Sequence, residues 1–143
     1  MTILGGLRDL FHTQAERLRH RPFLEATMAA SALVATADGE VSFSERVRMD
    51  ELLESLELLK VYDVHTAVDL FNDHVASLEE DRDKGRAEVF AAVEKIAGEP
   101  EEGLLLLRVC RAISEADGEY AESERRAIEE LAKVLNLPPE LLT

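Results

Sequence analysis

A ten-residue acidic segment occurs twice in this chain, and it constrains the fold more than any other feature. Residues 37–46 and 116–125 share Ala-Asp-Gly-Glu, then an apolar residue, a serine three positions further on, and a closing Glu-Arg at the same offsets. Each copy follows one apolar run with helical spacing and precedes another. The repeat therefore predicts two helix–acidic turn–helix units.

The composition favours helices throughout. At 143 residues the chain is long enough for one domain with its own core. Leu, Ala and Glu are abundant, β-branched residues are sparse and Trp is absent, a bias that favours helix over sheet. The single cysteine, Cys110, lies in an apolar run and is expected to be a buried core residue. We expect an all-α fold, a compact array of about six to seven helices built from two pseudo-symmetric helix–acidic turn–helix units.

The repeat divides this single helical domain into four parts. They are an amphipathic N-terminal arm (1–21), a first repeat unit (22–60), linking helices (61–98) and a second repeat unit (99–143). The arm has an apolar stripe at steps of three and four residues: Leu4, Leu7, Phe11, Ala15 and Leu18. Two interpretations stay open for this stripe, which are docking on the core and a weak contact with a membrane surface.

Local signals predict the helix ends of the first unit. Pro22 opens an apolar inner helix that ends where Gly39 can adopt the left-handed conformation. Ser42 and Glu45 form a capping box for the next helix, which continues to about residue 59. The apolar face of that helix is expected at Val47, Leu52, Leu53, Leu56 and Leu59.

Similar signals follow in the rest of the chain. Asp63 is expected to cap a linking helix, residues 79–83 to form a charged connector, and Gly98 to end a second linking helix. Pro100 opens the second inner helix. The pair Pro138-Pro139 is expected to close the last long helix before a short turn at 140–142. The two inner helices, apolar on nearly all sides, are expected at the centre of the array.

The net charge of −14 is unevenly distributed. Residues 1–22 carry four arginines against Asp9 and Glu16, a net +2, so the remainder of the chain carries −16. An acidic body argues against a nucleic-acid interface, which requires clustered Lys and Arg, and suits cations or basic partners. No apolar run approaches the ~18 residues of a membrane span, and the start of the chain lacks the pattern of a signal peptide. We expect a cytoplasmic protein.

The acidic turns resemble the second half of a calcium-binding loop. In that loop, Gly takes position 6 for the sharp turn and a bidentate Glu takes position 12, which is the last. When Gly39 and Gly118 take position 6, positions 5 and 12 fall on carboxylates in both copies: Asp38 and Glu45, Asp117 and Glu124.

The first half of the calcium-loop pattern is missing. Position 1 falls on Val34 or Ile113, so each loop alone offers too few oxygens for tight calcium binding. A divalent cation such as Ca²⁺ or Mg²⁺ would have to be shared between the two turns. Further carboxylates would contribute from outside: Glu40, Glu115 and Glu119.

Helix capping is the competing interpretation of the same residues. Asp-Gly at a helix end and Ser-x-x-Glu at a helix start are common capping signals, and they suffice for the first copy. In the second copy Ala121 replaces the capping serine, yet Asp117 and Glu124 keep their seven-residue separation, which capping alone does not explain. Ser123 offers a substitute cap. A cation site and pure capping therefore both stay open.

No other cluster of residues indicates catalysis. The four histidines show no ligand spacing with a carboxylate: His12, His20, His65 and His74. The sequence has no Gly-rich phosphate loop, no nucleophile signature and no cysteine pair for zinc. We expect that the protein is not an enzyme.

The doubled Ala-Asp-Gly-x-x-x-x-x-Glu, with an apolar helix before and an amphipathic helix after each copy, resembles the TerB family of tellurite-resistance proteins. This family also occurs as a domain of J-domain co-chaperones. The resemblance covers residues 23–142 and implies an all-helical domain with a metal-binding role at Asp38, Glu45, Asp117 and Glu124. It also implies association with stress-response proteins at the inner face of the membrane.

Two functions follow from this interpretation. The first is a cation-responsive interaction module of the stress response that acts through its acidic turns. The alternative is a protein-binding scaffold or regulatory domain that needs no metal and uses its acidic face for basic partners.

Overall fold

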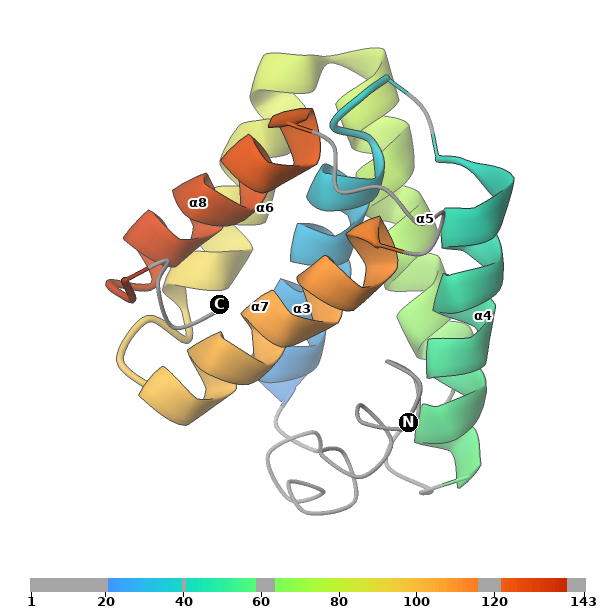
Figure 1. Ribbon diagram of the computed structural model, residues 1–143, viewed down its shortest axis with the longest axis horizontal. Helices are drawn as coiled ribbons and strands as arrows, with labels where there is room; N and C mark the ends of the chain where they lie inside the picture. The colour runs from blue at the N-terminus through green and yellow to red at the C-terminus, as the bar shows by residue number, and fades with distance from the viewer. Residues whose placement is uncertain (1–20, 40, 59–63, 116–121, 139–143) are drawn as a thin grey trace.

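Helix α3 (Arg21–Ala35) passes through the middle of the molecule, and the other helices pack around it (Figure 1). The computed structural model describes residues 21–39, 41–58, 64–115 and 122–138, with the backbone alone for 52–58 and 64. These ranges form six helices and no strand, which confirms the all-α prediction. The other five helices are α4 (Phe43–Leu58), α5 (Val64–Glu80), α6 (Arg82–Glu94), α7 (Pro100–Ser114) and α8 (Glu122–Val134).

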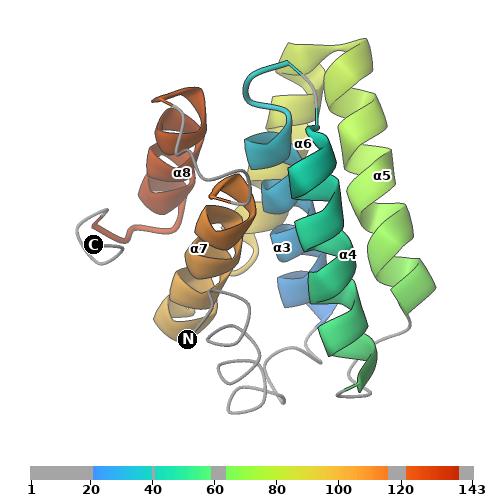
Figure 2. The same cartoon turned by 45° about the vertical axis from the view of Figure 1, so that its right-hand side comes forward.

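Small apolar residues explain the central position of α3. Twelve of its fifteen residues are buried, and four of its alanines have no exposed surface, namely Ala26, Ala29, Ala30 and Ala32. Side chains this small let neighbouring helices approach closely from several sides. Helices α5, α6, α7 and α8 all contact α3, with α4 and α5 on one side of it and α8 on the other (Figure 2).

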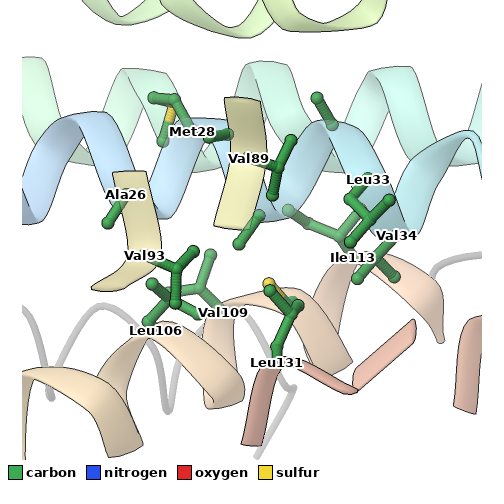
Figure 3. Packing of buried hydrophobic residues seen from close by; sticks show 14 of the residues in the cluster. Ala26, Met28, Leu33, Val34, Val89, Val93, Leu106, Val109, Ile113 and Leu131 are labelled. Carbon is green, nitrogen blue, oxygen red and sulfur yellow. The ribbon is translucent and has the colours of Figure 1, made fainter. Parts of the chain in front are cut away.

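The core is continuous between the two halves of the chain. Met28 of α3 lies near Val89 of α6, and Leu33 of α3 lies near Ile113 of α7 (Figure 3). Leu106 of α7 belongs to the same cluster. All five side chains are at most 1 % exposed. Burying a side chain of this size contributes about 1.5–3 kcal/mol, so this shared core is a main source of stability.

The helix bounds follow the sequence repeat. Helix α3 spans 21–35 and α7 spans 100–114, so both ends differ by the same offset that separates Ala37 from Ala116 in the acidic segments. The second helices of the two units, α4 and α8, begin at Phe43 and Glu122, again at that offset. The two units therefore agree in local structure at three of their helix bounds.

The predicted connector at 79–83 is wrong, because almost all of it is helical. Helix α5 continues to Glu80 and α6 begins at Arg82, which leaves only Asp81 between them. Asp81 is extended (φ −148°, ψ 102°), and its carboxylate accepts the Lys84 N–H at 3.2 Å. A single N-cap residue is enough to change the chain direction here, so no longer connector is needed.

Three further details differ from prediction. Helix α8 ends before Pro138, because Asn136 adopts a positive φ of 59° and the Leu137 N–H bonds to the Ala132 carbonyl at 2.9 Å, which is the geometry of a Schellman cap. Val47, expected on the apolar face of α4, is 38 % exposed. Helix α7 lies beside α3 rather than at the centre, since its Arg108 faces solvent.

Several predictions fall outside the described residues. They concern the N-terminal arm, the cap at Asp63 and the short turn at 140–142. Within the described ranges, no helix has both the length and the apolar character that crossing a membrane requires.

Candidate metal centre at the acidic turns

The first acidic turn begins where α3 ends. The Gly39 N–H donates to the Thr36 carbonyl at 2.9 Å, and Gly39 has a φ of +114°. A side chain at this φ would be strained, so glycine is the residue that allows the turn. The neighbouring Asp38 side chain is exposed to solvent. The turn therefore presents an exposed carboxylate at the end of the central helix, with Glu40 outside the described residues.

Glu45 holds the start of α4 in place. Its Oε1 accepts the Ser42 N–H at 2.9 Å, while the Ser42 Oγ accepts the Glu45 N–H at 3.1 Å. This reciprocal pair is the predicted capping box. Glu45 is only 3 % exposed. One of its oxygens is thus engaged in capping, and a cation at the turn would have to bind the other or share the first.

The second acidic turn is described only at its two edges. Glu115 follows α7, is half-buried, and accepts from the Arg111 Nε at 2.8 Å. Glu124 lies in the first turn of α8 and is 4 % exposed, almost the same as its counterpart Glu45. Asp117 and Glu119 lie outside the described residues. The repeat therefore preserves the burial of the glutamate as well as its identity.

The inner helices bring the two edges to one end of the molecule. Helices α3 and α7 pack against each other and run in the same direction, and their C-terminal ends lie close together in both views (Figures 1 and 2). The two acidic turns start from these ends. The described edges of the two acidic turns therefore lie at the same end of the molecule.

A contact between Ser31 and Cys110 links the two inner helices at equivalent positions. The two residues match in the repeat, as Ala37 matches Ala116, and both are fully buried. Burial raises the pKa of the Cys110 thiol to about 12, and the adjacent Ser31 hydroxyl acts in the opposite direction. Ser31 Oγ has no partner in full hydrogen-bonding geometry within the described residues, so this is a loose polar contact. Ser31 and Cys110 therefore lie near each other at equivalent positions of the two repeats, and the two-fold relation between the units stays a prediction.

Arg82, which the sequence did not single out, lies beside the first turn. Its Nη1 donates to the Thr36 Oγ1 at 2.7 Å, and Thr36 is position 3 of the calcium-loop pattern. Burial, followed by the charge of Arg86, lowers the Arg82 pKa from its usual value. Arg82 and Thr36 lie far apart in the sequence, so no local signal could have indicated their contact. A positive charge of the protein itself is therefore close to the first acidic turn.

The described residues alone do not complete a metal site. Across 21–39, 41–58, 64–115 and 122–138, no three His, Cys, Asp or Glu side chains are grouped so that they could hold a metal ion. Val34 and Ile113, at position 1 of the calcium-loop pattern, are buried in the core. A cation bound to Asp38 would thus need ligands from outside the described ranges, where Glu40, Asp117 and Glu119 lie.

Comparison with known proteins identifies the family. The family model described as tellurite resistance protein TerB matches residues 24–142 and so includes both acidic turns. The chain is also similar to the tellurium resistance protein TerB of an Alcaligenes species, with 33 % identity over 106 residues, which cover 73 % of this chain and 87 % of that protein. No solved structure matches the chain. The chain therefore belongs to the TerB family of tellurite resistance proteins.

Proposed function

We propose that this protein is a tellurite-resistance accessory protein whose two acidic turns share a divalent cation and thereby control its contact with another protein. The family match, which spans both turns, supports the resistance role. The parallel inner helices, whose ends lie together at one end of the molecule, support a shared site. The proposal includes no catalytic step and places the protein in the cytoplasm, where it associates with partners at the inner face of the membrane.

The role proposed for each carboxylate follows from how deeply its side chain is buried. Asp38 is exposed and can bind a cation without leaving the protein surface. Glu45 and Glu124 are buried at helix starts and so have few rotamers available. A cation would bind between the aspartates and these positioned glutamates, with Glu40, Glu115 and Glu119 adding negative charge and water completing the coordination.

Calorimetric titration of the purified protein with Ca²⁺, Mg²⁺, Mn²⁺ and Zn²⁺ tests the cation directly. We expect saturable binding of at least one of these ions, and loss of binding in Asp38→Asn with Asp117→Asn. A matched control is Asp69→Asn with Asp73→Asn, which removes the same charge from exposed positions of α5. Equal loss of binding in both double variants would mean that net charge, rather than a site, attracts the ion.

The same variants test the cellular role. In a host whose survival in tellurite depends on this protein, the Asp38/Asp117 variant should lose protection while the Asp69/Asp73 variant keeps it. If both variants still protect the host, the acidic turns are not required for resistance.

Arg82 favours a second candidate function, a protein-binding scaffold that needs no metal. Because its guanidinium already lies beside Thr36, the first turn has a positive charge nearby without any metal. In this alternative the acidic face binds basic segments of partner proteins directly. Absence of heat with all four cations, together with cellular protection that still requires Asp38 and Asp117, would favour the scaffold over the cation site.

A further inference from the structure

The outer side of α4 exposes apolar side chains beside the first acidic turn. Phe43 is 83 % exposed and Val47 is 38 % exposed, and they are the large hydrophobic residues that the described ranges leave exposed. With Ser44, Arg48 and Glu51 they line a pocket on this side of the helix. Phe43, Val47 and Glu51 follow one another at steps of four, so they share one face. We call this surface the α4 outer face.

The inward side of the same helix is already occupied. Glu45 and Met49, also separated by a step of four, are buried at 3 % and 1 %. Arg46 reaches α5, where its Nη1 donates to the Asn72 Oδ1 at 3.2 Å and its guanidinium stacks over Phe71. Phe43 and Val47 are therefore not the residues through which α4 packs on the core, because α4 contacts the core with its other side.

The second repeat shows what these positions contain when they face solvent. In the repeat alignment that matches Ala37 with Ala116, Phe43 corresponds to Glu122 and Val47 to Arg126. In α8 these two residues are 63 % and 73 % exposed and form an ion pair, with Arg126 Nε 3.5 Å from Glu122 Oε1. A charged pair is the ordinary content of an exposed helix face. Its replacement by two apolar residues in α4 alone indicates that the α4 outer face is covered.

We infer that residues 3–20, within the N-terminal arm of this same chain, cover the α4 outer face. The arm has an apolar stripe of its own, formed by five residues at helical spacing: Leu4, Leu7, Phe11, Ala15 and Leu18. It lies before residue 24, where the family match begins, and it directly precedes the first repeat, the copy with the apolar face. The second repeat, with its ion pair, follows α6 instead, whose apolar residues Val89 and Val93 are already buried in the core.

Charge and reach agree with this assignment. The arm and the start of α3 carry a net +2, whereas α4 carries five acidic residues against two arginines. Helix α4 runs antiparallel to α3, so Phe43 lies at the opposite end of the molecule from Arg21 (Figure 1). A helix over residues 3–20 would be about 27 Å long, against about 22 Å for α3, and would reach the level of Phe43. Pro22 interrupts helical hydrogen bonding there and lets the chain reverse.

A photo-crosslinking amino acid at position 43 of the full-length chain tests the occupant. We expect crosslinks within one molecule to peptides from residues 3–20. The matched control carries the same amino acid at position 122, the equivalent position of α8, and should give no crosslink to the arm. Crosslinks from position 43 to a second copy of the chain, or to no peptide of the arm, would overturn the inference.

Tryptic cleavage of the arm at Arg8, Arg17 and Arg19 gives an independent measurement. Because cleavage follows the undocked population, Phe43→Ser with Val47→Ser should speed it by about tenfold or more. Glu122→Ser with Arg126→Ser, at the equivalent positions of α8, should leave the rate unchanged. An equal rate in the wild type and in both variants would overturn the inference, as would cleavage that slows only when anionic vesicles are added, since the stripe would then belong to a membrane contact. Neither experiment depends on cation binding.

Discussion

Glu45 and Glu124 are acidic residues buried at the starts of equivalent helices, and such burial requires compensation. A carboxylate taken out of water costs several kcal/mol unless it is hydrogen-bonded. For Glu45 the compensation is visible, because Oε1 accepts the Ser42 N–H and the helix start provides a favourable dipole. A glutamate held in this way is positioned before any ligand arrives. In the proposed cation site, Glu45 would therefore be a cap and a ligand in the same position.

Replacing Ser42 by Ala tests how much the cap contributes. The Ser42 Oγ accepts the Glu45 N–H at 3.1 Å, and loss of such a cap typically costs about 1 kcal/mol. We expect urea unfolding of Ser42→Ala to show a free energy of unfolding lower by about that amount. Ser44→Ala is the control, since the Ser44 hydroxyl makes no hydrogen bond within the described residues, and it should be nearly neutral. Equal stability of the two variants would show that the capping box adds nothing measurable.

At the level of helices, the predicted helix starts at the prolines and at the capping box are confirmed, whereas Gly98 does not end the second linking helix, because α6 already ends at Glu94. Pro22 and Pro100 lie at the starts of α3 and α7, and the capping box precedes α4, because each signal acts over three or four residues. The connector at 79–83 was predicted wrongly because its charges resemble those of a loop. Its helical structure depends instead on a contact between α5 and α6, which residue spacing does not reveal.

Gly85 of α6 lies closer to its neighbouring residue, Leu78 of α5, than any other glycine of the described ranges lies to its own neighbours. A Cβ at this position would lie 2.7 Å from Leu78 Cα and 2.8 Å from Leu78 N, which are backbone atoms that cannot move aside locally. We expect Gly85→Ala to destabilise the protein by about 1–3 kcal/mol, although alanine favours helix by up to about 1 kcal/mol. The measurement is thermal or urea unfolding followed by circular dichroism.

Gly98→Ala provides the matched control. A Cβ at Gly98 would meet nothing within 4 Å, and its φ is not positive. This variant should be neutral or more stable by about 0.4–1 kcal/mol, because alanine restricts the unfolded chain. If Gly85→Ala were also neutral, the two helices would be able to separate without cost.

At the scale of the whole molecule, most of the architecture that could be predicted from the sequence was predicted from the repeat. It indicated two similar units, and the structure adds matching helix bounds and the contact between Ser31 and Cys110. The sequence did not indicate that α3 rather than α7 is central, because both helices are apolar and only the packing of α5 and α6 distinguishes them. Arg82 and the exposed Val47 were missed for the same reason, since each depends on residues far along the chain.

The candidate site was predictable only in part. The positions of Asp38 and Glu45 at the first turn follow from glycine and capping chemistry, and both agree with the structure. The arrangement of Asp117, Glu119 and Glu40 lies outside the described residues, so the shared site stays a prediction.

The net charge of −14 leads to a prediction about salt. Like charges repel at long range, and the Debye length falls from about 30 Å at 0.01 M to about 10 Å at 0.1 M monovalent salt. We expect the melting temperature to rise over this range. Glu79→Gln with Glu80→Gln should raise it at low salt and reduce its dependence on salt, because both carboxylates lie exposed at the C-terminal end of α5, where the helix dipole is already negative.

Glu129→Gln distinguishes repulsion across the molecule from this local effect. Glu129 is exposed in the middle of α8, away from either helix end, so its substitution changes only the net charge. We expect Glu129→Gln to raise the melting temperature at low salt as well, but by less per charge removed than Glu79→Gln with Glu80→Gln does. A melting temperature that falls as NaCl increases would mean that attractive pairs, such as Arg86 with Glu130 and Arg111 with Glu115, outweigh the repulsion. In that case a divalent cation that raises the melting temperature at matched ionic strength would be acting through a specific site, because screening alone would lower it.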